Sequence, residues 1–172
     1  MKRRKKIQIL FLLPFVLIIF LWPLVWTHAQ ELAGDEVCSF TIGDGSSFSG
    51  TYVVEVDEGG AFAFNDFENS QFVIEINGNN NISIMLILES LTEGKHVFSM
   101  EMQAAIDISK DGGDNFVGFS NYKEEGGGYI QIDKIDKDNA KLVGGFSGIF
   151  HEDMAPEGVN VELSGAFNVI LE

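Results

Sequence analysis

Arginine, cysteine, proline and tryptophan are almost missing from the sequence after residue 30. No arginine follows Arg4, so the body of the chain has no guanidinium fork with which to grip a phosphate or carboxylate. Cys38 is the only cysteine, so the chain forms no intrachain disulfide and depends on a packed core for its stability. Pro156 is the only proline after residue 30. Both tryptophans, Trp22 and Trp26, lie before residue 30.

Positive charge is equally scarce in the body of the chain. Five of the 11 basic residues lie within residues 2–6, whereas all 26 acidic residues come after residue 30. Residues 30–172 therefore contain six lysines and carry a net charge of −20. A surface this negative repels phosphate backbones and anionic lipid headgroups, which excludes nucleic acid as a partner.

The N-terminus has the layout of a secretory targeting segment. The basic run at residues 2–6 is followed by residues 7–26, which include no charged side chain, and then by Thr27 and Ala29 at the spacing of a cleavage site. The apolar run is also long enough to span a bilayer. Residues 1–29 are therefore predicted to be a signal peptide or an uncleaved N-terminal anchor. Either alternative predicts an extracytoplasmic protein: secreted, periplasmic or held at the cell surface.

After a short acidic linker at residues 30–36, the sequence predicts one β domain over residues 37–172. Short runs of β-forming residues alternate there with turns rich in glycine, asparagine and aspartate. The final run alternates apolar and polar side chains, as expected for an antiparallel sheet with one buried face. The predicted strands are 37–42, 47–56, 61–67, 71–76, 81–88, 96–108, 116–122, 128–133, 141–150 and 159–171.

About ten short strands joined by tight turns predict an all-β fold. Two architectures stay open at this point: a single antiparallel β-sandwich, or a lipocalin-like meander barrel. A step of the form small residue, glycine, any residue, aromatic recurs within the strands, for example at Ser164–Phe167. It is typical of bends where an aromatic ring packs over a neighbouring glycine.

The order of glycines and apolar positions in residues 94–98, 128–132, 141–146 and 161–169 resembles a group of extracytoplasmic all-β proteins, many of them lipoproteins, common in Bacteroidetes-type bacteria. The likeness covers residues 94–171. It implies export and an all-β fold, and it implies no catalytic mechanism because the group has no established activity. The chain departs from the lipoprotein pattern, because Cys38 follows Asp35-Glu36-Val37 and not the end of the apolar run. Cys38 is therefore predicted to be a buried strand thiol.

One segment has the spacing of a calcium loop. Asp107, Ser109 and Asp111 place oxygen atoms at alternate positions before a glycine, and Asp114 follows. This is the first half of an EF-hand loop, but Gly118 stands where the bidentate glutamate belongs. Residues 133–139 form a second acidic turn. The alternative interpretation of both segments is that they are solvated hairpin turns, since turns favour these residue types.

Catalysis has little support in the sequence. The exported part has two histidines, His96 and His151, and Ser147 lacks the second glycine of a nucleophile elbow. The predicted function is a non-catalytic envelope or secreted module that binds an unidentified protein or small ligand. A carrier of a small apolar ligand, held in a barrel cavity, is the alternative, and a hydrolase is the third possibility. The only expected contact with a membrane is through an uncleaved N-terminal segment.

Overall fold

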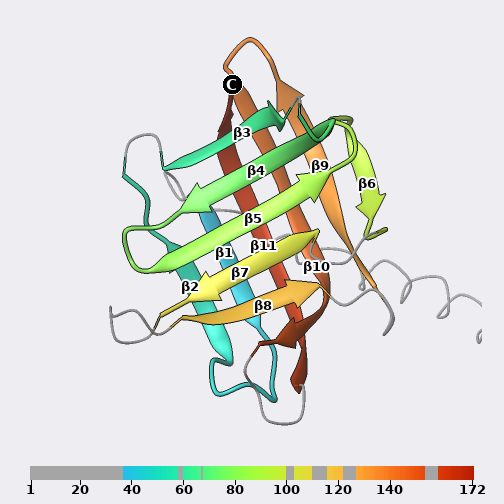
Figure 1. Cartoon of the computed structure of the whole chain (residues 1–172). Coiled ribbons are helices and arrows are strands. Elements are labelled where there is room, and N and C mark those ends of the chain that lie inside the picture. The colour runs from blue at the N-terminus through green and yellow to red at the C-terminus, as the bar shows by residue number, and fades with distance from the viewer. Residues whose placement is uncertain are drawn as a thin grey trace, which may run out of the picture.

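The computed structural model describes residues 37–57, 60–66, 68–99, 103–109, 116–121, 127–153 and 159–172. The predicted targeting segment and linker lie outside these residues. Within them the chain is all-β, with eleven strands in one mostly antiparallel sheet and no helix (Figure 1). The strands are β1 (Cys38–Ile42), β2 (Gly50–Val54), β3 (Ala61–Asp66), β4 (Gln71–Asn77), β5 (Ile82–Leu88), β6 (Gly94–Val97), β7 (Ala104–Ile108), β8 (Val117–Asn121), β9 (Gly128–Asp136), β10 (Lys141–Glu152) and β11 (Val159–Leu171).

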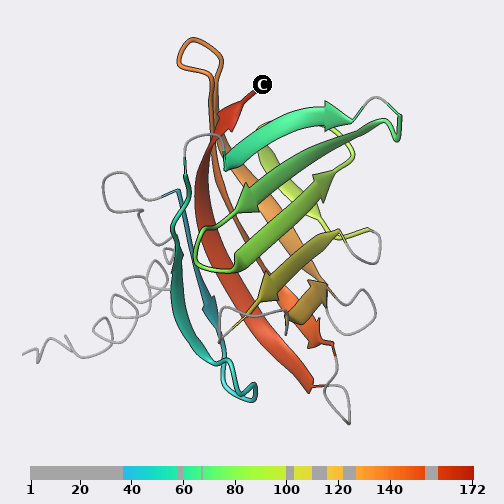
Figure 2. The ribbon, with the colours of Figure 1, turned by 60° about the vertical axis from the view of Figure 1, so that its left-hand side comes forward.

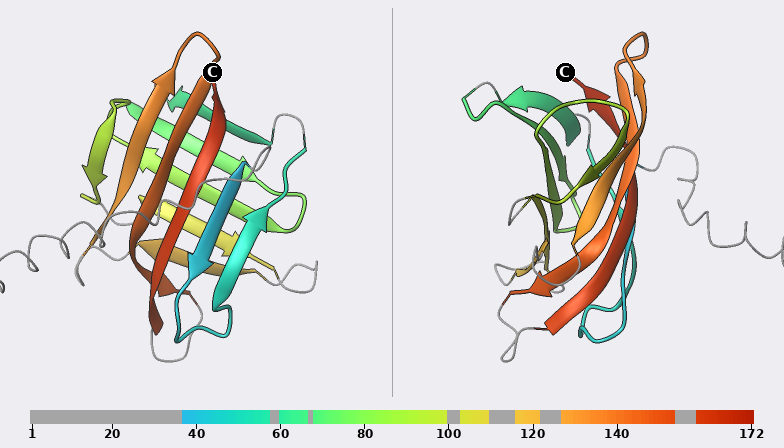
Figure 3. Two further views of the ribbon diagram at one scale, coloured as in Figure 1. Left: turned by 180° about the vertical axis from the view of Figure 1, so that it is seen from behind. Right: turned by 90° about the vertical axis from the view of Figure 1, so that its right-hand side faces the viewer.

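The sheet folds into two layers that are joined through the long strands β10 and β11. The first layer has the order β2-β1-β11-β10-β9-β6, and the second has the order β3-β4-β5-β7-β8. The strands of the two layers cross one another, and the layers are seen edge-on in the right-hand view of Figure 3. The layers join where β11 pairs with β3 and where β10 pairs with β8. These two junctions close seven strands into a partial ring, an arrangement between the predicted sandwich and the predicted barrel.

Most of the predicted strands are confirmed, and so is the buried face of the last one. Val161, Leu163, Phe167 and Val169 are buried, while Glu162 and Ser164 between them are exposed. The long hairpin formed by β9 and β10 projects beyond the ends of the other strands (Figure 2). It contains a β-bulge between Val143 and Gly144.

The prediction of one continuous strand over residues 96–108 is wrong. The structure forms two strands there, β6 on β9 in one layer and β7 between β5 and β8 in the other. β6 ends at Val97, and beyond it the side chain of Gln103 accepts a hydrogen bond from the Ser99 amide. In the sequence an apolar residue stands at every second position from Phe98 to Ile108, so periodicity alone does not reveal that the chain changes layers. One pairing also departs from the antiparallel prediction, because β11 and β3 run parallel at Ile170 and Leu171.

An aromatic row crosses the inner face of the first layer. Phe40 pairs with Tyr52 on one side and with Gly165 on the other, and Phe146 pairs with Gly165 from β10. The Phe40 and Tyr52 rings stack with centroids 5.2 Å apart. A β-carbon at Gly165 would lie 2.7 Å from both Phe146 Cζ and Phe40 Cβ. The glycine therefore leaves the room that two large side chains occupy, as the repeated glycine–aromatic step predicts.

Candidate functional site

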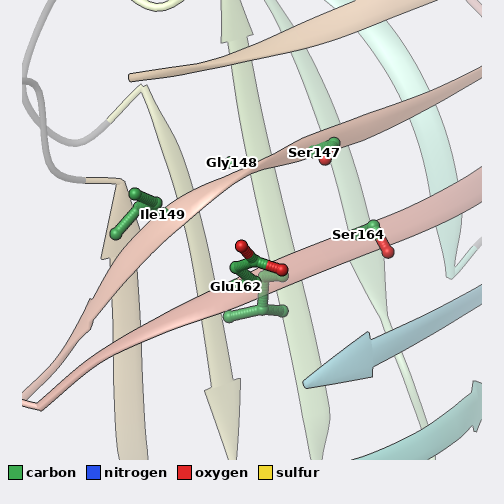
Figure 4. Close-up of a pocket in the computed structure, with 6 residues that line it drawn as sticks. Ser147, Gly148, Ile149, Glu162 and Ser164 are labelled. Atoms are coloured by element: carbon green, nitrogen blue, oxygen red, sulfur yellow. The ribbon is translucent and has the colours of Figure 1, made fainter. Parts of the chain in front are cut away.

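The outer face of the first layer has a shallow hollow over β10 and β11. Its side chains are those of Ser147 and Ile149 from β10 and Glu162 and Ser164 from β11, which point to the same side of the ladder (Figure 4). The antiparallel register places Ser147 opposite Ser164, and Ile149 opposite Glu162. The hollow has a volume of about 260 Å³.

Glycines border this hollow. Gly148 lies between Ser147 and Ile149 on β10 and contributes its backbone, whereas a β-carbon there would point to the inner face, 3.0 Å from Phe98 Cε2. On the β1 side, a β-carbon at Gly43 would lie 3.5 Å from the β-carbon of Glu162, so the glycine leaves that carboxylate uncovered. On the β9 side, the Ile149 amide donates to the carbonyl of Gly127, which also has no side chain.

The polar groups of the hollow are available to a ligand. Within the described ranges, neither the hydroxyls of Ser147 and Ser164 nor the carboxylate of Glu162 has a hydrogen-bond or ion-pair partner. Both serines have neighbours on the same outer face, Tyr129 beside Ser147 and Thr41 beside Ser164. The hollow is therefore a polar recess with one negative charge, set in a strip of side chains that carry hydroxyl groups.

The interior between the layers is filled with large side chains. Phe40, Phe119, Phe150 and Phe167 are at most 1% exposed. The ring of Phe150 meets those of Phe98 and Phe146 edge-to-face, with centroids 6.1 and 6.3 Å apart. Aliphatic side chains at most 2% exposed occupy the rest of this core, including Ile42, Ile74, Ile76, Ile84, Leu86, Leu88, Ile106 and Ile130. The apolar residues that could line a carrier's cavity thus contact one another.

The structure places two of the four predicted calcium ligands, Asp107 and Ser109; Asp111 and Asp114 lie outside the described residues. Asp107 is on the exposed side of β7, whereas Ser109 is buried and its amide donates to the carbonyl of Asn81. No cluster of three or more histidine, cysteine, aspartate or glutamate side chains suited to a metal ion occurs in the described part of the chain. The calcium hypothesis remains a prediction.

The sequence does not reveal a charged neighbour of Asp107, which is Asp153. Asp107 pairs with Gly118 of β8, whose carbonyl accepts a hydrogen bond from the Asp153 amide. A β-carbon at Gly118 would lie 2.7 Å from Asp153 Oδ2 and 3.1 Å from Asp107 Oδ1, so the two carboxylates flank the glycine. Loss of water around the side chain, together with the charge of Asp153, raises the pKa of Asp107. Only the register of β8 with β10 brings these residues together.

The second acidic segment is a hydrogen-bonded turn. The carboxylate of Asp136 accepts hydrogen bonds from the backbone amide and the side-chain amide of Asn139, and it pairs with Lys134 at 2.6 Å. The hydrogen bond from Lys134, followed by those from Asn139, lowers the pKa of Asp136 to about 2. Residues 137–140 thus form the turn between β9 and β10, and the Asp136 carboxylate at its start is hydrogen-bonded within it.

The two histidines contact oxygen atoms of the fold, and the cysteine is buried. His96 Nε2 lies 2.8 Å from the Thr92 carbonyl oxygen, and His151 Nδ1 lies 3.2 Å from Asn160 Oδ1. Cys38 is fully buried in β1, as predicted, and this burial raises the pKa of its thiol to about 12. A thiol held in its neutral form is a poor nucleophile.

No protein-family model matches the chain, and no curated protein or solved structure is significantly similar to it. Among the described residues, no helix is both long and apolar enough to cross a membrane.

Proposed function

We propose that this chain is an exported, non-catalytic β module that recognises a partner or ligand with its outer surface. One observation carries the proposal: large side chains fill the interior, while the polar hollow over β10 and β11 opens outward. A ring of about eight strands is only just wide enough for its own side chains or for one small ligand. Here the ring has seven strands and phenylalanines project into it.

The same observation argues against the carrier alternative. A carrier has to keep an apolar space of several hundred Å³ open in the folded state. In this core, Phe150 is fully buried and its ring lies edge-to-face with two others. A ligand would have to displace close-packed side chains, which costs contacts that the ligand must replace.

Xenon binding to the full-length chain tests the filled interior. Xenon enters apolar cavities, and NMR reports its position residue by residue through methyl shifts. We expect the methyl signals of Ile84, Ile106 and Ile130 to stay unchanged under xenon pressure. A Phe150→Ala variant is the positive control, because the removed ring leaves a cavity that takes up the gas. Saturable shifts of these methyls in the unaltered chain would instead support the carrier.

Export is supported by the basic residues 2–6 and the uncharged run at residues 7–26. The full chain is fused at Glu172 to alkaline phosphatase, which acquires its disulfides and its activity only outside the cytoplasm. We expect an active fusion, and an inactive one after Leu17→Arg places a charge in the middle of the apolar run. Equal activity of the two fusions would contradict export by this segment.

A further inference from the structure

We infer that the hollow over β10 and β11 binds a primary ammonium group carried on a short aliphatic stem, such as the side chain of a lysine. This inference rests on the proposed function, because it names the ligand chemistry of the outer surface. Four side chains of the hollow share one face of the ladder: Ser147, Ile149, Glu162 and Ser164 (Figure 4).

The polar groups match the donors of an ammonium ion. An ammonium ion presents three hydrogen-bond donors and no acceptor. Two hydroxyls and one carboxylate offer acceptors from three separate positions, Ser147, Ser164 and Glu162, and none of them has another partner in the described part of the chain. Opposed residues of an antiparallel pair have β-carbons about 4.5–5.5 Å apart, close enough for one small cation to reach groups on both strands. A planar guanidinium fork is matched less well by acceptors that converge from different directions.

The apolar part of the ligand also has a place. Ile149 lies opposite Glu162, so a stem that brings an ammonium to the carboxylate passes over the isoleucine. Long basic side chains commonly bury their methylene groups in this way while the charged end stays polar. The volume of about 260 Å³ is below the range of about 300–1,000 Å³ typical of pockets for drug-sized molecules. The hollow therefore suits one side chain or a small amine.

Charge favours the same ligand. Residues 30–172 carry a net charge of −20, so the surrounding potential attracts cations and repels anions. One cation that the structure places on this face is Lys95, whose Nζ lies 3.7 Å from the centroid of the Tyr129 ring. Tyr129 is the β9 neighbour of Ser147. An ammonium of the chain itself thus already lies on this face, against an aromatic ring beside the hollow.

The test is an NMR titration of the full-length chain with blocked lysine (Nα-acetyl-lysine methylamide). We expect saturable shifts of the Ser147, Gly148, Glu162 and Ser164 amides, with affinity in the millimolar range. Acetylation of the lysine Nε removes the charge and should abolish the shifts. If blocked arginine or glycerol produces equal shifts, or if blocked lysine produces none, the inference is wrong.

Two variants test whether blocked lysine binds in the hollow. Glu162→Gln keeps the shape of the side chain, lies on an exposed position and should weaken binding by about tenfold or more. Glu55→Gln is the matched control, because it removes another exposed carboxylate of the same charge outside the hollow. If both variants weaken the binding of blocked lysine equally, the binding depends only on the overall charge of the protein, and the inference of a site at Glu162 is wrong.

Butylamine identifies the source of the ammonium group. If blocked lysine shifts the four amides at lower concentration than butylamine does, the contacts extend to a peptide backbone and the ligand is a lysine of another chain. If the two bind equally, the ammonium and its stem suffice and a free amine is the ligand. A negative titration leaves the xenon result untouched, so failure of this site and failure of the proposed function are distinguishable.

Discussion

The ring of Phe146 packs directly over Gly165, the residue opposite it in the β10–β11 ladder. A β-carbon at Gly165 would come within 2.7 Å of Phe146 Cζ, and Phe40 closes the other side at the same distance. Gly165→Ala should therefore destabilise the fold by about 1–3 kcal/mol, the usual cost of overpacking a core. Urea unfolding of the two proteins measures the difference.

The neighbouring Ser164→Ala change is the control for that experiment. Ser164 is exposed on the outer face, so its truncation should change the free energy of unfolding by less than about 0.5 kcal/mol. The double variant Phe146→Leu, Gly165→Ala should be more stable than the sum of the two single changes predicts, because the smaller side chain makes room for the methyl group. Strict additivity would show that the ring and the glycine are not coupled.

The carboxylates of Asp107 and Asp153 should titrate as neighbours. Desolvation, followed by the charge of Asp153, raises the pKa of Asp107 from its usual value of 3.8. Asp153→Asn should lower the pKa of Asp107 only in part, because it removes the smaller of the two causes. NMR titration of the Asp107 carboxyl carbon provides the measurement, and an unchanged pKa in the variant would contradict the contact across Gly118.

The same pair sets a dependence of stability on pH. Because its folded-state pKa is raised, Asp107 binds its proton more tightly in the folded chain than in the unfolded chain. Ionised Asp107 therefore destabilises the fold at neutral pH, and this penalty disappears as the pH falls below 3.8. Asp107→Asn should raise the melting temperature at pH 7 by about a degree or two, a small gain because solvent screens the pair. Melting curves recorded below pH 3.8 should coincide for the two proteins.

The calcium hypothesis makes a separate prediction about the same carboxylate. If the Asp107 loop binds calcium, the ion stabilises the folded state by mass action, and millimolar calcium should raise the melting temperature by several degrees. Asp107→Asn should remove this rise, while magnesium should give a smaller one because it prefers six regularly placed ligands. Identical melting curves with calcium and with chelator would rule the site out.

Cys38 should be inert in the folded protein. Its thiol is fully buried and burial raises its pKa to about 12, so almost no thiolate is present at neutral pH. Labelling with an aromatic disulfide reagent should proceed only as fast as the chain unfolds, and should be complete at once in denaturant. Rapid labelling under native conditions would contradict the burial of β1.

Ala140 holds a backbone conformation that favours glycine. Its φ angle is 49° in the turn between β9 and β10, and its carbonyl accepts a hydrogen bond from the Leu171 amide. Ala140→Gly should relieve this strain and stabilise the protein by up to about 1 kcal/mol, less the entropy that glycine loses on folding. Chemical unfolding checks the sign. A matched Ala105→Gly change in the extended strand β7 should destabilise instead.

Local chemistry explains why so much of the fold was predictable. The alternation of Val161, Leu163 and Phe167 with Glu162 and Ser164 identifies a strand and its buried face without any tertiary information. By contrast, the split of residues 96–108 into β6 and β7 leaves no periodic signal, because an apolar residue stands at every second position from Phe98 to Ile108 without a break. The layer that a strand joins depends on its partners, and these are distant in sequence.

The candidate site likewise depends on contacts that the sequence does not reveal. Asp107 and Ser109 are two residues apart in sequence, yet one is exposed and the other buried, and the carboxylate beside Asp107 comes from Asp153. Ser147 and Glu162 gain a common ligand-sized recess only because β10 and β11 pair in one register. The spacing of residues in the sequence does not reveal such contacts, because they form only when strands far apart in the sequence pair in the folded sheet.

By itself, the sequence determined three properties: an all-β fold, a core without disulfides and a strongly negative surface. These follow from side-chain alternation, from a cysteine count of one and from the separation of basic and acidic residues. The tertiary structure alone decided that seven strands close into a partial ring, that the interior is packed, and that the polar recess faces outward. Composition and periodicity depend on residues that are close together in the sequence. The closure of the ring and the shape of the recess depend on the register between strands that are far apart in the chain.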